Sequence, residues 1–197
     1  MGRKSRAELR REEILAAFER CIGQYGIDVP LERIADEAGV QRSLIRHYLG
    51  NRDEVVDQVI ARIAEAYPRR VADLLIPARA RGVAGVLDVF FAGEVSTTDW
   101  DNVIHAVVNT AQGRYPLAKE RVAQMIVAIV EHIAAALVQL FPQATPAASY
   151  EAAYGLLCLA QANEELRWLG LPPHYTPMAR ANASRLLDAL AEQPLSP

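Results

Sequence analysis

Residues 31–52 read LERIADEAGVQRSLIRHYLGNR, and this stretch decides the fold. In its first half the apolar residues recur at i, i+3, i+4 and i+7, which gives a helix of about two turns one apolar face. Gly39 follows, and glycine ends such a helix because it lacks a Cβ that would clash in the left-handed conformation. In the second half, Ile45 and Leu49 share an inward face on an otherwise polar, cationic helix. Two short helices with a glycine turn between them predict a helix-turn-helix.

The second helix of this pair has the size to enter a major groove of DNA. Its arginines can reach phosphate or guanine, its serine a phosphate, its leucine a thymine methyl group, and its histidine and tyrosine phosphate oxygens. A solvated helix face is the ordinary alternative for such charges, and Tyr48 could equally pack under the first helix. The predicted DNA contacts are Gln41, Arg42, Ser43, Leu44, Arg46, His47, Tyr48 and Arg52.

Residue patterns elsewhere are helical too, without runs of alternating β-branched residues, and predict an all-α protein of about nine helices. Ser5 with Glu8, and Asn51 with Glu54, have the spacing of capping pairs, so we expect a helix to begin directly after each. The other predicted boundaries are Gly26 as the end of the first helix, a loop at 77–82, a cap at Thr97 or Thr98, and starts at Thr145-Pro146 and Thr176-Pro177.

Composition and apolar patterning indicate a folded chain and predict neither a membrane-spanning helix nor a signal peptide. Of the 197 residues, 51% are hydrophobic, which is enough for a sizeable core. The most apolar stretch, 125–141, is interrupted by polar residues and is shorter than the roughly 20 residues of a membrane span, so it predicts a buried helix. The first residues, MGRKSRAELRREE, lack the apolar run of a signal peptide. Cys21 and Cys158 lie far apart in helical patterns, which fits a reducing cytoplasm.

The charge distribution is more informative than the net charge of −3. Residues 1–52 hold ten Lys and Arg against eight Asp and Glu, whereas the remainder holds eleven against sixteen. The basic part therefore coincides with the helix-turn-helix, as expected of a nucleic-acid-binding region. We predict a DNA-binding domain at 1–52 and a second helical domain at 53–197.

The N-terminal pattern resembles the TetR family of one-component transcriptional regulators. The resemblance rests on a first helix with an aromatic residue, the segment IADEAGV at 34–40, a recognition helix ending in HYL at 47–49, and a basic residue opening the next helix. It extends over about 14–56. Family members usually carry Ser or Thr at Pro30 and Gln41, and often Tyr at Arg46, so the half-site sequence of the DNA is not implied.

The resemblance implies a homodimer paired through the last two helices, and small residues there allow close helix packing. Intrachain packing alone is the alternative. The residues expected at the dimer interface are Ala153, Leu157, Ala160, Ala183, Leu186 and Leu190. Two-fold symmetry would set two recognition helices about 34–36 Å apart, one turn of DNA.

The second domain is expected to bind a small apolar effector and to control the DNA-binding domain through the helix that begins at Arg52. We interpret that helix as the only covalent connection between the two, with a kink or hinge at Pro68. Glu131 and His132 would face a pocket, a subunit interface or a partner side chain, since an unpaired buried charge is costly. The candidate effector-binding residues are Trp100, Ile104, Val108, Met125, Glu131 and His132.

No catalytic or metal-binding pattern is present in the sequence. The histidines at 47, 105, 132 and 174 lack metal-ligand spacing, and neither cysteine has a nearby partner. We therefore expect a cytoplasmic, ligand-responsive DNA-binding regulator, most simply a repressor, with no cofactor, no metal and no membrane partner. The alternative is a helical adaptor that binds protein and no DNA. The effector, the operator and the regulated genes are not encoded in any of these patterns.

Overall fold

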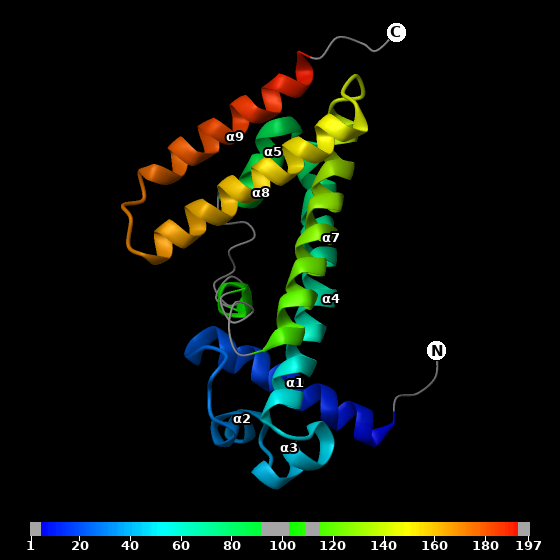
Figure 1. The fold of residues 1–197 in the computed structure, drawn as a ribbon, viewed down its shortest axis with the longest axis vertical. Coiled ribbons are helices and arrows are strands. Elements are labelled where there is room, and N and C mark those ends of the chain that lie inside the picture. Colours follow the sequence, from blue (N-terminus) through cyan, green and yellow to red (C-terminus); the bar gives the residue numbers. More distant parts are fainter. Residues whose placement is uncertain (1–4, 92–102, 109–114, 193–197) are drawn as a thin grey trace. The chain divides into compact units, whose positions relative to one another are not determined.

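The computed structural model describes residues 5–91, 103–108 and 115–192, and all the regular structure in these ranges is helical (Figure 1). The predicted all-α class is confirmed. The helices are α1 (Arg6–Tyr25), α2 (Leu31–Ala38), α3 (Arg42–Leu49), α4 (Arg52–Arg79), α5 (Gly82–Phe91), α7 (Pro116–Leu140), α8 (Pro146–Trp168) and α9 (Tyr175–Ala191), with a further helical segment at 103–108.

Several predicted helix ends are confirmed by their hydrogen bonds. The Ser5 hydroxyl accepts from the Glu8 N–H at 3.2 Å, and the Glu8 carboxylate accepts from the Ser5 N–H at 2.6 Å. This reciprocal pair satisfies two amides that have no partner within the helix. Asn51 and Glu54 make the same exchange at the start of α4, at 3.0 and 2.7 Å. The Thr145 hydroxyl caps α8 by accepting from the Ala148 N–H at 3.2 Å.

Two predicted boundaries are wrong. Helix α4 continues through Pro68 and Pro77 to Arg79, so no loop begins at residue 77. A proline costs a helix one hydrogen bond, and buried side chains such as Leu75 and Ala78 hold this part of α4 in place despite that loss. Helix α9 begins at Tyr175, so Thr176 is not its cap. The proposed caps at Thr97 and Thr98 lie outside the described residues.

The described chain packs as two compact units. The first unit contains residues 5–66, 103–108 and 115–124, and the second contains 67–91 and 125–192. These units differ from the predicted division at residue 52. Helices α4 and α7 each contribute residues to both units. Helix α4 is therefore not the only covalent connection, which corrects the interpretation from sequence.

The core of the first unit joins α1, α2 and α3 with the first turns of α4. Phe18 is fully buried, as are Ile34 of α2 and Ile45 of α3. Near this core, the Arg62 guanidinium lies 2.6 Å from the Glu19 carboxylate. Burial raises the pKa of Glu19, and Arg62 opposes that shift. Helices α2 and α3 both contact α1. The apolar faces that the pattern at 31–49 predicts are thus buried against the same helix.

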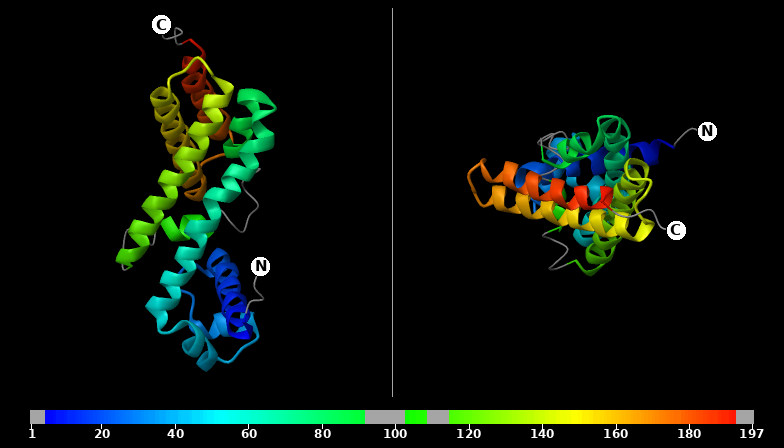
Figure 2. Two further views of the ribbon diagram at one scale, coloured as in Figure 1. Left: turned by 90° about the vertical axis from the view of Figure 1, so that its right-hand side faces the viewer. Right: turned by 90° about the horizontal axis from the view of Figure 1, so that it is seen from above.

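The second unit is organised around α8 and α9, which lie side by side and antiparallel with α5 packed against them (Figures 1 and 2). Gly155 allows this close approach, because a Cβ at that position would lie 2.7 Å from a Leu186 methyl carbon. Arg180 of α9 reaches Asp88 of α5 at 2.8 Å. The small residues at the end of the sequence thus pack within one chain.

Helix α7 is apolar but not buried on most sides, which corrects the prediction. The stretch Leu117–Leu140 is long and apolar enough to cross a membrane by composition, with a mean hydropathy of 1.7, and 44% of its most apolar window is buried. The core helix of a soluble protein passes the same test. Leu117, Val127 and Val138 are exposed. The helix therefore has a buried face and an exposed apolar one.

We predict that Phe18→Ala lowers the free energy of unfolding by about 3–5 kcal/mol, because it removes a ring with no exposed surface and leaves a cavity. Urea unfolding followed by circular dichroism measures the change. Leu9→Ala is the control, since Leu9 lies on the same helix and is 48% exposed. Equal effects of the two substitutions would contradict the assignment of Phe18 to the core.

Candidate nucleic-acid interface

The turn between α2 and α3 has the geometry that the sequence predicts. Gly39 has φ +62°, in the left-handed region, and its N–H donates to the carbonyl of Asp36 at 3.2 Å. The Val40 N–H donates to the Ala35 carbonyl at 2.9 Å. These bonds satisfy carbonyls at the end of α2 that lack helical partners. The turn thereby fixes the direction in which α3 leaves.

Helix α3 divides sharply into a buried and an exposed face. Ile45 and Leu49 are buried. Tyr48 is half-buried, with its ring 5.0 Å from that of His47 in an edge-to-face arrangement. The remaining predicted DNA contacts of this segment are exposed, namely Gln41, Arg42, Ser43, Leu44, Arg46 and His47. A recognition helix has this arrangement, in which buried aliphatic side chains hold a short helix in place and cationic side chains are exposed.

Arg42 has a partner on the preceding helix. Its guanidinium donates to the carboxylate of Glu32, and both side chains are about half exposed. Exposed ion pairs contribute only about 0–1 kcal/mol, so a phosphate can replace Glu32 at little cost. The sequence patterns gave no indication of this pair, because ten residues separate its members.

Arg52 does not face outward, which corrects its prediction as a DNA contact. Its guanidinium donates to the carbonyls of Ile27 and Val29, in the segment between α1 and α2. It also lies over the Phe18 ring, with Cζ 5.2 Å from the ring centroid. Arg52 is thus half-buried and holds the α1–α2 connection onto the core.

The predicted effector-binding residues are not gathered in one unit. Trp100 lies outside the described residues. Ile104 and Val108 belong to the first unit, whereas Met125, Glu131 and His132 belong to the second. In the single chain Glu131 is exposed and His132 is half-buried. Among the described residues, no group of three His, Cys, Asp or Glu side chains could hold a metal ion.

The predicted dimer residues face inward to a large extent. Ala153, Ala160, Ala183 and Leu190 are buried within the single chain, so they are not available to a second copy. Leu157 and Leu186 are half-buried. The exposed side of α8 carries a different apolar row instead: Ala147, Tyr150, Tyr154, Cys158 and Ala162.

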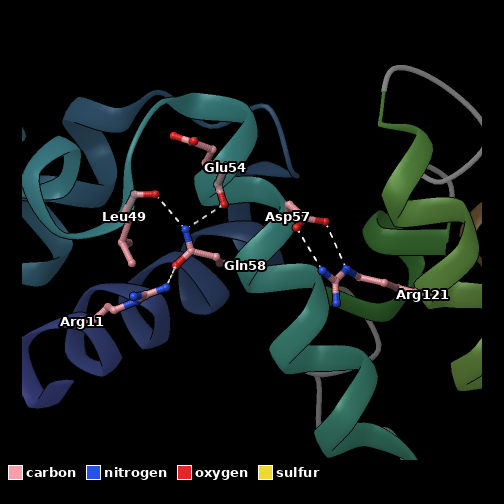
Figure 3. A network of polar contacts seen from close by, with 6 residues as sticks. All are labelled: Arg11, Leu49, Glu54, Asp57, Gln58 and Arg121. Atoms are coloured by element: carbon pink, nitrogen blue, oxygen red, sulfur yellow. Dashed lines mark hydrogen bonds and ion pairs between the residues drawn. The ribbon is translucent and has the colours of Figure 1, made fainter.

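Sequence reasoning also missed a polar cluster beside α3. Gln58 of α4 contacts the last carbonyl of α3, and its neighbour Asp57 pairs with Arg121 of α7 (Figure 3). Long-range polar contacts of this kind leave no periodic signal, because each residue alone looks like a solvated helix position.

The fold and the exposed cationic helix define the class of helix-turn-helix proteins. Residues 14–59 match the sequence model of the bacterial regulatory proteins of the tetR family. The N-terminal region is therefore similar to that of the TetR family.

The relatives that match in sequence do so over a short stretch. The HTH-type transcriptional regulator BetI of Brucella anthropi is 47% identical over 49 residues, which are 24% of this chain and 25% of that protein. The match thus spans about a quarter of the relative's length.

Solved structures match over nearly the whole chain. A transcriptional regulator from Rhodococcus sp. Rha1 has a TM-score of 0.71 at 18% identity, covering 93% of this chain and 99% of that one. The multidrug binding protein EbrR, solved in complex with proflavin, has a TM-score of 0.65 at 20% identity, with 90% and 99% covered. At these identities the likeness shows the fold.

We predict that Arg52→Ala lowers the free energy of unfolding by about 1–3 kcal/mol, because the carbonyls of Ile27 and Val29 lose a donor. Urea unfolding measures it. The control is Arg10→Ala, which breaks an exposed ion pair with Glu13 worth about 0–1 kcal/mol. If Arg52→Ala left stability unchanged and instead reduced the salt dependence of DNA binding, Arg52 would be a DNA contact, as the sequence predicts.

Proposed function

We propose that this protein is a DNA-binding transcriptional regulator that acts as a repressor and is released from its operator by a small apolar effector. The observation that carries the proposal is the exposed cationic face of α3, opposite buried Ile45 and Leu49. The match of residues 14–59 to the model of the bacterial regulatory proteins of the tetR family supports the DNA-binding role. A soluble, cytoplasmic location follows from that role.

The DNA contacts divide by side-chain chemistry. Arg42 and Arg46 are proposed to contact phosphate or guanine, since an arginine fork fits both. Ser43 and His47 reach phosphate oxygens, and Leu44, which is 37% exposed, meets a thymine methyl group. Arg52 is left out of this set because its guanidinium is engaged by backbone carbonyls.

A homodimer is proposed through the exposed row on α8, defined above as Ala147, Tyr150, Tyr154, Cys158 and Ala162. Tyr150 and Tyr154 are 43% and 58% exposed, a large apolar area for one helix face to leave in water. Two recognition helices related by a two-fold axis would read half-sites one DNA turn apart, at about 34–36 Å.

Two observations support the proposal that an effector controls DNA binding. The neighbour EbrR is a multidrug binding protein solved with proflavin. In this chain, Pro68 lies inside α4 two residues beyond Ala66, the last residue that α4 gives to the first unit. A proline there lacks the N–H that would bond to the carbonyl four residues back, so α4 can bend at that point. A coupling of about 1–3 kcal/mol would change operator occupancy 5- to 150-fold.

We predict that the wild-type protein selects a specific duplex from a pool of randomised sequences, and that Arg46→Ala weakens its binding. Loss of one phosphate contact should reduce the slope of log affinity against log salt by about 1. Mobility-shift titrations at several salt concentrations measure both. Arg81→Ala is the matched control, since it removes the same charge from the second unit.

Failure of the wild-type protein to select any duplex would overturn the proposed function and favour the adaptor. An equal change of slope in Arg46→Ala and Arg81→Ala would reject α3 as the DNA-contacting surface. Expression of a reporter behind the selected duplex tests repression, because removal of the regulator should raise it.

We predict that Tyr154→Arg converts the dimer to a monomer, because two charges would be buried without partners in a symmetric interface. Sedimentation equilibrium measures the mass. Leu9→Arg is the control, since Leu9 is similarly exposed but lies on α1. A Tyr154→Arg protein that stays dimeric would place the interface elsewhere.

A further inference from the structure

Gln58 joins three helices through one side chain (Figure 3). Its amide nitrogen donates to the Leu49 carbonyl at 2.7 Å and to the Glu54 carbonyl at 3.0 Å. Its amide oxygen accepts from the guanidinium of Arg11 on α1. A carboxamide is suited to this position, because it donates and accepts at the same time without a net charge.

Leu49 is the last residue of α3, the helix proposed to face DNA, so its carbonyl is the last one of that helix. The last carbonyls of a helix have no partner within it, and here the chain turns away at Gly50 with φ +92°. Because the Leu49 side chain is buried and its carbonyl is bound by Gln58, both the rotation and the direction of this end of α3 are restrained. Residue 58 is therefore placed to influence the orientation of the exposed face of α3.

The preceding residue of α4 points to a different helix. The guanidinium of Arg121 on α7 donates two hydrogen bonds to the carboxylate of Asp57. Nε lies 3.1 Å from one carboxylate oxygen, and Nη2 lies 3.0 Å from the other. A two-pronged contact fixes orientation as well as distance. Figure 3 shows Asp57 and Gln58 directed to opposite sides of α4, one toward α7 and the other toward α3 and α1. All these residues belong to the first unit.

We propose that Gln58 is a positioning residue that sets how α3 is presented to DNA, and that the Asp57–Arg121 pair fixes the same turn of α4 to α7. We call Arg11, Gln58, Asp57, Arg121 and the Leu49 carbonyl the polar relay. The relay makes specific recognition depend on α7, a helix that carries none of the proposed DNA contacts. This inference rests on the proposed DNA-binding function.

Gln58→Met tests the first part, because methionine has a similar volume but can neither donate to Leu49 nor accept from Arg11. Binding is compared between the duplex selected by the wild-type protein and a duplex of random sequence. We expect specific affinity to fall about five- to tenfold, as for the loss of a hydrogen bond to a part-buried group, with non-specific affinity unchanged. Gln58→Glu should fall at least as far, because a carboxylate keeps the contact with Arg11 but repels the Leu49 carbonyl.

Gln124→Met is the matched control. Gln124 lies on α7 in the same unit, is exposed, and donates only within its own helix, to Glu120 at 3.3 Å. Its specific-to-random affinity ratio should equal that of the wild-type protein. Amide hydrogen exchange at residues 46–50 of the free protein should rise in Gln58→Met and not in Gln124→Met.

A double-mutant cycle tests the second part. Asp57→Ala and Arg121→Ala should each lower the specific-to-random ratio about threefold, and the double variant should lower it no further, since either change alone already breaks the pair. Additive effects would overturn the role of α7. An unchanged ratio in Gln58→Met would overturn the positioning role of Gln58, whereas a wild-type protein without duplex selectivity would overturn the proposed function itself and with it the relay's role.

Discussion

Burial of the apolar faces of α2 and α3 against α1 is the constraint on which the proposed DNA-contacting surface depends. Ile34 and Ile45 have no exposed area, and both belong to helices of only eight residues. Helices this short are not stable alone, so packing around Phe18 makes them helical. The same burial turns the cationic residues of α3 outward. Stability and recognition are therefore two consequences of one pattern.

The arginines near that core have different roles. A count of basic residues does not distinguish these roles. Arg52 binds backbone carbonyls and covers an aromatic ring, whereas Arg46 is exposed on α3. Arg42 forms an exposed ion pair with Glu32 of α2. Arg121 joins α7 to α4. Because Arg42 and Arg52 have partners within the chain, the basic balance of residues 1–52 overstates how many of its charges are available to DNA.

The second unit uses its small residues for internal packing. Gly155 lets the Leu186 side chain approach α8, and Ala153 and Ala183 are fully buried in the same chain. The row of Tyr150 and Tyr154 on the outer side of α8 is left to water in the single chain. In the proposed dimer, close packing of α8 against α9 within each chain holds α8 in place. The exposed tyrosines of α8 then form the contact between the two copies.

The sequence by itself determined the helical class, the glycine turn at residue 39, the capping pairs at Ser5 and Asn51, and the outward face of α3. These features are local, because they depend on periodicity, on backbone conformation and on hydrogen bonds within one turn. The tertiary structure alone decided which arginine faces solvent, which small residues are already buried, and that Gln58 holds the end of α3. Such contacts join residues far apart in the chain, and their partners can be known only when the helices have packed.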